Sequence, residues 1–134
     1  MSEENVQIAR RAWEAFQRGD MDAFVSFWDP EIVYDLQHFH NWPESSYHGV
    51  DGIRRFLTEW LEMWGEYEVD VEEVLAAPDG RVVSLFTHRA KGGQSGLPIV
   101  LPMAHIVTLR NGKVIRFDVY DDRAEALAAA GLRE

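Results

Sequence analysis

The first quarter of the chain has apolar residues at helical spacing in two stretches. The first helix begins at Ser2, a residue type that accepts hydrogen bonds from free backbone amides, and ends at Gly19-Asp20. Its apolar face consists of Val6, Ala9, Trp13 and Phe16. A short second helix, capped by Asp20 or Asp22, ends at Asp29-Pro30 because the residue before a proline avoids helical geometry. The apolar side of this second helix consists of Phe24, Phe27 and Trp28.

A strand and a loop separate these helices from a third one. Residues 31–36 carry Ile32, Val33 and Tyr34 and predict a strand, and residues 37–47 predict a loop. The third helix opens at residues 49–52, and we expect Gly65 to cap its C-terminus. Its broad apolar face consists of Ile53, Phe56, Leu57, Trp60, Leu61 and Trp64.

The second half of the chain is typical of antiparallel strands. The predicted strands span residues 67–74, 81–90, 99–109 and 114–120. The strongest hairpin signal is Asn111-Gly112 between the last two, and Asp121 or Asp122 then caps a short helix that ends at Gly131. Helices with one strand followed by a run of strands favour an α+β fold. We expect a curved, mainly antiparallel sheet wrapped around helices on its inner face, as a cone with one deep pocket, in a single domain of residues 1–134.

Composition removes several classes of function. The 134 residues include 13 basic and 23 acidic side chains, for a net charge of −10, and no cysteine. So acidic a protein repels nucleic acid and anionic membranes, and disulfides, thiolate metal sites and cysteine nucleophiles are excluded. No apolar run approaches the roughly 20 residues that span a bilayer, and no signal peptide is visible. We therefore expect a cytoplasmic protein that contacts neither nucleic acid nor membrane.

Two polar residues stand out among apolar neighbours. Asp35 ends the first strand, and a carboxylate just inside an apolar pocket would have a raised pKa and could act as a general base. No arginine or lysine adjoins it in the sequence. The alternative is an exposed aspartate at a strand end. His105 lies in mid-strand on the same face as Met103 and Val107, and is either a structural histidine or a pocket residue.

Other residues are candidates for the lining of the pocket or for a metal site. The predicted lining residues are Trp28, Trp60, Trp64, Phe117, Val119 and Asp121. His38 and His40 could place two imidazoles on one side of an extended segment, but a metal would need a third ligand such as Asp35 or His48. A polar loop over the mouth of the pocket is the simpler interpretation, and we predict neither a metal nor a cofactor.

Three segments carry a resemblance to a known superfamily. They are GDMDAFVSFWDPEIVYD, YHGVDGIRRFLTEW and LRNGKVIRFDVYDDRAEALAAAGL, beginning at Gly19, Tyr47 and Leu109. Nearly the whole chain resembles the nuclear transport factor 2-like superfamily, and within it the polyketide-cyclase-like (SnoaL-like) and ketosteroid-isomerase-like proteins. The resemblance implies the cone fold, a homodimer, and one of several functions, from isomerase, cyclase, hydrolase or dehydratase to non-catalytic binder.

The site residues of these relatives match only in part. Val33-Tyr34-Asp35 is similar to the motif that carries the base of the isomerases, and His105 occupies the place of their oxyanion donor. The tyrosine of their first helix would fall near Ala12, and that helix has none. The epoxide hydrolase pattern is absent, since Thr87, Arg89 and Val119 stand at its positions, whereas Asp35 or Asp121 could serve a cyclase.

Two hypotheses about function follow, with a third in reserve. The first is a cofactor-independent enzyme that moves a proton on an apolar carbonyl compound, as an isomerase or cyclase does, with Asp35 as base and His105 as hydrogen-bond donor. The second is a carrier or binding protein for a small apolar molecule, favoured if Asp35 lies outside the pocket. The third is a dimerisation module.

We also expect a homodimer built on the outer face of the sheet, because large apolar side chains are unusual on a solvated face. The outer face is predicted to carry Val82, Ser84, Phe86 and His88 on one strand, and Arg116, Asp118 and Tyr120 on another.

Overall fold

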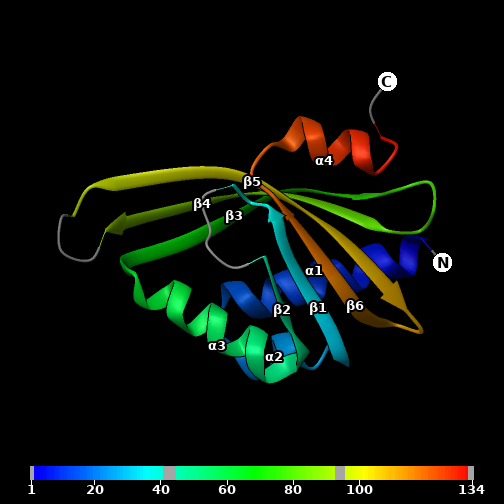
Figure 1. Cartoon of the computed structure of the whole chain (residues 1–134), viewed down its shortest axis with the longest axis horizontal. Coiled ribbons are helices and arrows are strands. Elements are labelled where there is room, and N and C mark those ends of the chain that lie inside the picture. The colour runs from blue at the N-terminus through cyan, green and yellow to red at the C-terminus, as the bar shows by residue number, and fades with distance from the viewer. Residues whose placement is uncertain (1, 41–44, 93–95, 133–134) are drawn as a thin grey trace.

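A computed structural model describes residues 2–40, 45–92 and 96–132 of the chain. Ten elements follow one another in it (Figure 1). The helices are α1 (Ser2–Gln17), α2 (Met21–Val25), α3 (Gly49–Glu62) and α4 (Arg123–Ala129). The strands are β1 (Trp28–His38), β2 (Ser46–His48), β3 (Trp64–Ala76), β4 (Val82–Gly92), β5 (Pro98–Arg110) and β6 (Lys113–Tyr120).

The six strands form one curved sheet in the order β2-β1-β6-β5-β4-β3. Neighbouring strands run antiparallel except for β1 and β6, which are parallel. This parallel pair sets an early segment of the chain beside a late one. The predicted α+β class with a mainly antiparallel, curved sheet is confirmed.

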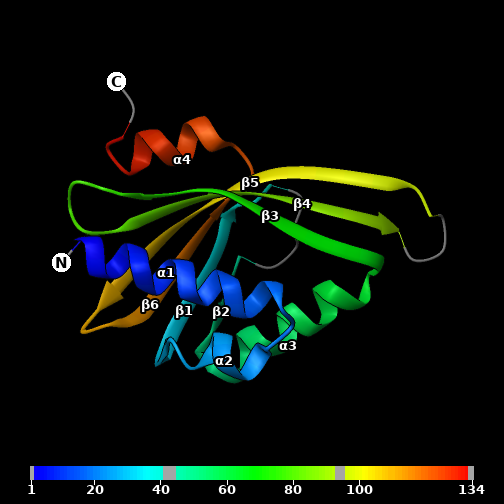
Figure 2. The ribbon, with the colours of Figure 1, turned by 180° about the vertical axis from the view of Figure 1, so that it is seen from behind.

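The helices cover both faces of the sheet. Helices α1, α2 and α3 lie on the concave side, where α1 contacts β3 and β4 and α3 contacts β1 (Figures 1 and 2). Helix α4 packs on the opposite, outer face against β4, β5 and β6. We expected helices on the inner face alone, and this expectation is wrong for α4, which covers part of the outer face.

The predicted ends of α2 and α3 are both wrong, because in each case the next strand begins earlier than the local sequence pattern suggests. Trp28 opens β1 rather than closing α2, because the Phe27 carbonyl already accepts a hydrogen bond of 2.9 Å from the Val114 amide of β6. Gly65 is not the cap of α3 but lies within β3, whose first residue, Trp64, pairs with Gly92. Sheet pairing overrides the local signals in both cases.

Several local signals are confirmed. The Asp20 carboxylate caps α2 by accepting a hydrogen bond of 3.0 Å from the Ala23 amide, and Asp122 caps α4 through the Glu125 amide at 3.1 Å. Asn111 adopts φ 54° at the β5–β6 turn, the left-handed geometry that tight hairpins require. No helix in the described part of the chain is long and apolar enough to cross a membrane.

Candidate ligand-binding cavity

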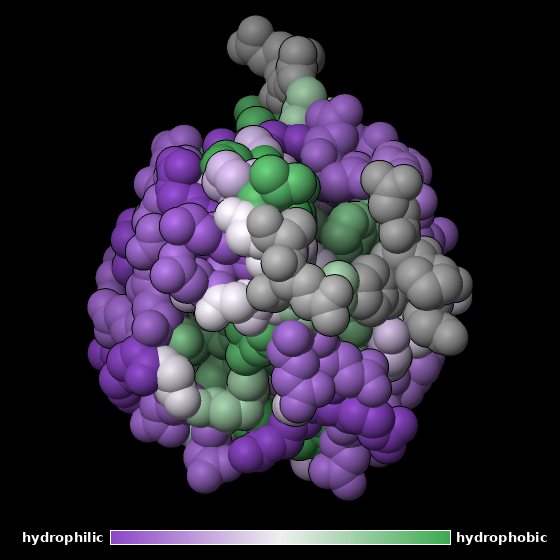
Figure 3. Space-filling view, turned by 90° about the vertical axis from the view of Figure 1, so that its left-hand side faces the viewer, coloured by the Kyte–Doolittle hydropathy of each residue, from purple (hydrophilic) through white to green (hydrophobic). Residues whose placement is uncertain are grey.

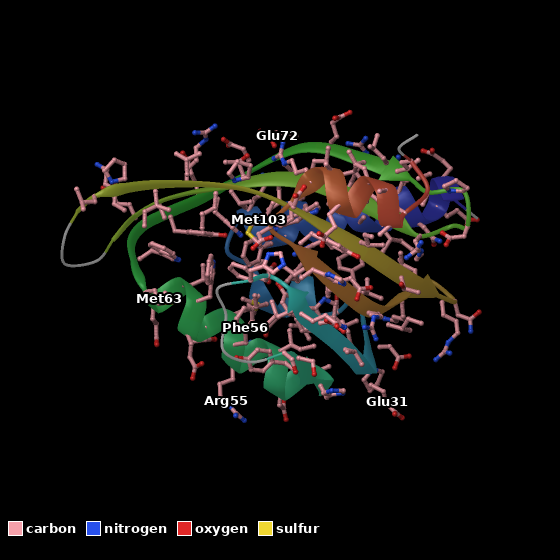
Figure 4. All side chains as sticks on the ribbon, turned by 45° about the horizontal axis from the view of Figure 1, so that its top comes forward. Glu31, Arg55, Phe56, Met63, Glu72 and Met103 are labelled. Atoms are coloured by element: carbon pink, nitrogen blue, oxygen red, sulfur yellow. The ribbon has the colours of Figure 1, made fainter. Side chains whose placement is uncertain are left out.

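A cavity of about 40 Å³ lies between the concave face of the sheet and the helices. Its wall is mostly aromatic, with Trp13 and Phe16 from α1 and Phe56 and Trp60 from α3. Phe56 and Met103 enter this space from α3 and β5, on opposite sides (Figure 4). The other lining residues are Phe24, Tyr34, Leu36, Phe39, Leu57, Tyr67, Phe86, His88, His105 and Val119. One face of the molecule shows a hollow with apolar side chains inside a hydrophilic rim (Figure 3).

Tyr67 and His88 form the clearest polar contact in the cavity. The Tyr67 hydroxyl oxygen lies 2.5 Å from Nδ1 of His88, between neighbouring strands β3 and β4. Burial raises the pKa of Tyr67 to about 12 and lowers the pKa of His88 to about 4. At neutral pH both groups are therefore uncharged. With the phenol O–H as the donor, Nδ1 is the acceptor and the neutral imidazole carries its proton on Nε2.

His105 is the second histidine of the cavity wall. Its ring stacks on Trp13 at a centroid separation of 5.6 Å and meets the ring of Phe86 at 4.5 Å. Burial, with a smaller contribution from His88, lowers its pKa to about 3, so it is neutral at physiological pH. Its Nδ1 atom is buried and has no hydrogen-bond partner in the described structure.

The predicted lining residues are only partly brought together. Trp60 and Val119 line the cavity with His105, as expected. Phe117 lines a smaller neighbouring cavity of about 20 Å³ instead, behind Trp13. Phe117 and Val119 both point inward from β6, but because this strand curves along the cone they reach different cavities.

Three further predicted lining residues do not border the main cavity. Trp28 is buried in the core, where its ring packs edge-on against Phe24 at 5.2 Å. Trp64 packs against Trp60 from outside, at 5.5 Å. The Asp121 carboxylate accepts a hydrogen bond of 2.9 Å from the His40 amide, which ties the end of β6 to the segment after β1.

The structure places Asp35 on the outer face, which contradicts the prediction that it shares a cavity with His105. Tyr34 and Leu36, its chain neighbours, both line the cavity, and side chains alternate along a strand. The Asp35 carboxylate lies 2.5 Å from the Arg116 guanidinium of β6. Arg116 supplies in space the cation that the sequence around Asp35 lacks, and its Nε also contacts Asp118 at 3.0 Å.

The expected outer face is right on β6 and wrong on β4. Arg116 and Tyr120 lie outside, but Phe86 and His88 line the cavity. The pattern misleads because β4 is buried on both faces: its outward residues Val83 and Leu85 are covered by α4. Tyr120 belongs to the same covered cluster, with Ala104, Ile106, Ala126 and Ala130. The apolar patch that motivated a homodimer is therefore internal, and the homodimer stays a prediction.

The histidines considered for a metal have other contacts. His38 stacks on Tyr120 at 4.3 Å, and its Nδ1 lies 3.3 Å from the Glu125 carboxylate. His40 contacts Asp121 at 3.0 Å. Within the described residues no three histidine or carboxylate side chains gather closely enough to hold a metal ion.

Comparisons with known proteins agree with this architecture. An uncharacterised protein of Mycobacterium tuberculosis is 25% identical over 122 residues, which cover 90% of this chain and 91% of the relative. A nuclear transport factor 2-like protein of unknown function from Burkholderia pseudomallei superposes with a TM-score of 0.76, at 22% identity over 95% of this chain and 97% of the other.

A second protein with a similar structure was crystallised together with a small molecule. TerC, co-crystallised with polyporic acid, superposes with a TM-score of 0.74, at 21% identity over 95% of this chain and 97% of TerC. The model of the SnoaL-like domain family matches residues 9–117, which include part of α1, helices α2 and α3, and most of the sheet. With its cone-shaped architecture and its aromatic cavity, this chain belongs to the SnoaL-like domain family.

Proposed function

We propose that this protein binds a flat, largely apolar and uncharged small molecule in the cone cavity, and that His88 donates a hydrogen bond to an oxygen of this ligand. The observation that carries the proposal is the Tyr67–His88 pair in an aromatic wall. With the Tyr67 hydroxyl donating to Nδ1, the Nε2–H of His88 is the group left to donate to a ligand.

The character of the wall supports a flat, neutral ligand. Trp13, Phe86 and Trp60 offer aromatic faces, which favour stacked or edge-on rings. The residues that line the described cavity include no aspartate, glutamate, lysine or arginine. Burying a charged ligand among them would cost several kcal/mol without a compensating partner.

The size of the cavity indicates that the ligand must displace side chains. A volume of about 40 Å³ has room for only about three water molecules. A ligand with one or more rings therefore requires the walls to part, and α3, with Phe56 and Trp60, is the cover opposite the sheet. The co-crystallisation of TerC, a protein of the same fold, with polyporic acid supports a ligand-binding role for the cone.

Calorimetry with a matched pair of probes tests the proposal. Naphthol should bind about fivefold more tightly than naphthalene, because one neutral hydrogen bond contributes about 1 kcal/mol. The preference should vanish in His88→Leu and persist in His48→Leu, which changes an exposed histidine at the start of α3. Equal binding of both probes by the wild-type protein would refute the proposed role of His88.

A second candidate function is proton transfer on a carbonyl ligand, now without Asp35. The two neutral imidazoles favour it: His88 could donate to the carbonyl oxygen while His105 accepts a proton from the adjacent carbon. A pKa of about 3 makes His105 a weak base at neutral pH, so binding alone is the better supported function. Hydrogen–deuterium exchange on tetralone, followed by NMR, separates the two. If tetralone exchanges its hydrogens no faster with the protein than in buffer alone, proton transfer is refuted and ligand binding remains the proposed function.

A further inference from the structure

A second, smaller space adjoins the main cavity at Trp13. It measures about 20 Å³, enough for about one water molecule, and shares the Trp13 and Phe24 walls with the main cavity. Ala9 and Ala12 of α1 leave room for it beneath the helix. Its remaining described walls are apolar except for Ser84.

Ser84 has a hydroxyl that the fold itself does not use. The residue is fully buried, at 0% exposure, and its Oγ atom has no hydrogen-bond partner in the described structure. An unpaired buried hydroxyl destabilises a protein by about 1–3 kcal/mol. Alanine has nearly the same size and would fill this position without that cost, so packing gives no reason for a serine.

A second unpaired group lies next to Ser84, on His105 in the wall of the main cavity. Ser84 and His105 are directly opposite each other in the β4–β5 register, and Nδ1 of His105 is also buried without a partner. Two neighbouring polar atoms that both lack a hydrogen-bond partner on the concave face indicate that a polar group of a ligand supplies their hydrogen bonds. Since no charged side chain is among the described residues that line the small cavity, that group is a neutral hydroxyl or carbonyl.

The spacing along β4 relates this polar end to the one at His88. Ser84 and His88 are four residues apart on the same face, which corresponds to about 13 Å along a strand. Phe86 lies between them, and Trp13 packs against Phe86 at 4.8 Å. Along this wall, the aromatic side chains of Phe86 and Trp13 therefore separate the polar side chain of Ser84 from that of His88.

We propose that the small cavity is the second end of the ligand site, and that the ligand is an uncharged molecule of about two aromatic rings with an oxygen at each end, one at His88 and the other at Ser84 and His105. This proposal rests on the proposed ligand-binding function and adds the class of ligand to it. Both cavities share the side chains of Trp13 and Phe24, and Trp13 is the one that stacks on His105. Trp13 is therefore the partition that such a ligand displaces.

Calorimetric titration with para-hydroxybiphenyl and para,para′-dihydroxybiphenyl tests the two-ended site. The second hydroxyl should tighten binding to the wild-type protein about fivefold, the effect of one neutral hydrogen bond. In Ser84→Ala the two probes should bind equally, while Ser26→Ala, which removes an exposed hydroxyl after α2, should keep the preference. His88→Leu should weaken both probes by the same factor.

The outcomes separate this proposal from the one on which it rests. If para-hydroxybiphenyl binds but the second hydroxyl adds nothing, or if Ser84→Ala keeps the preference, the two-ended site is wrong and the proposed function stands. If neither probe binds, both are wrong. Ser84→Cys, in which a slightly larger thiol replaces the hydroxyl and hydrogen-bonds only weakly, serves in place of Ser84→Ala should that variant not fold.

Discussion

Tyr67 fixes the orientation of His88, through a hydrogen bond of 2.5 Å between the phenol and Nδ1 across two strands. In Tyr67→Phe the imidazole loses this donor, and its Nδ1 atom is left unpaired in a buried site. The ring can then turn or change tautomer, so Nε2–H no longer points reliably at a ligand oxygen. We expect the affinity for naphthol to fall by up to about fivefold, the whole effect of the His88 hydrogen bond, measured by calorimetry.

The matched control for this change is Tyr120→Phe. Tyr120 is also a buried tyrosine of the sheet but belongs to the outer cluster under α4, so its loss should leave the affinity for naphthol within about twofold. An equal loss of affinity in the two variants would point to a general effect on stability and would contradict the role given to Tyr67.

The two cavity histidines predict a loss of stability in acid. Burial lowers the pKa of His88 to about 4 and that of His105 to about 3, against about 6.5 in an unfolded chain. Below pH 6.5 the unfolded chain therefore binds protons that the folded protein does not, and the free energy of unfolding falls as the pH falls. The loss reaches up to about 1.4 kcal/mol per pH unit for each histidine, until the folded-state pKa is passed.

Urea unfolding at pH 7, 6 and 5 measures this dependence. The slope of unfolding free energy against pH should become shallower in His88→Gln by about 1 kcal/mol per pH unit, because glutamine does not titrate. His48→Gln, at an exposed position, should keep the wild-type slope. Parallel slopes for His88→Gln and the wild-type protein would mean that His88 is not buried in its neutral form.

Local signals in the sequence were sufficient for the fold. Helix caps at Asp20 and Asp122, and the turn at Asn111-Gly112, depend on neighbours in the chain and were found where expected. Their order already implied the α+β cone. The short strand β2 was missed, because three residues between a loop and a helix carry too little periodicity to detect.

The candidate site could not be found in the same way, because it depends on register. Between Val71 and Glu73 a bulge shifts the pairing of β3 with β4, so that Val69, rather than the next residue, lies opposite His88. A count outward from the turn at Asp79 misses this shift and places Tyr67 and His88 on opposite faces. For Asp35 the missing information was the partner strand, since Arg116 is distant in the chain.

Asp35→Asn tests the correction to the predicted base. The side chain lies on the outer face, so we expect the affinity for naphthol to stay within about twofold of the wild-type value. Stability should fall by about 1 kcal/mol, because Arg116 loses its closest charged partner while Asp118 and water still solvate it. Calorimetry and urea unfolding measure the two effects. Loss of ligand binding in a folded Asp35→Asn protein would restore Asp35 to the site.

Arg123 fastens α4 to the outer face of the sheet, opposite the cavity. Its guanidinium donates to the Phe86 carbonyl at 2.8 Å and to the Met103 carbonyl at 3.3 Å, and it pairs with Glu72, which projects from the outer face (Figure 4). Arg123→Met keeps the length of the side chain but removes these bonds, so the unfolding free energy should fall by about 1–3 kcal/mol. Hydrogen–deuterium exchange should accelerate at the α4 amides first.

The control for Arg123→Met is Arg55→Met, which changes an exposed arginine of α3 that points away from the fold (Figure 4). It should change the unfolding free energy by less than about 0.5 kcal/mol and leave the exchange rates of the α4 amides unchanged.

The backbone groups that Arg123 holds belong to Phe86 and Met103, whose side chains line the cavity from the other face. If α4 loosens while naphthol still binds normally, the sheet alone shapes the cavity. Unchanged α4 exchange in Arg123→Met would show instead that the apolar contacts of Ala126 and Ala130 suffice to hold the helix.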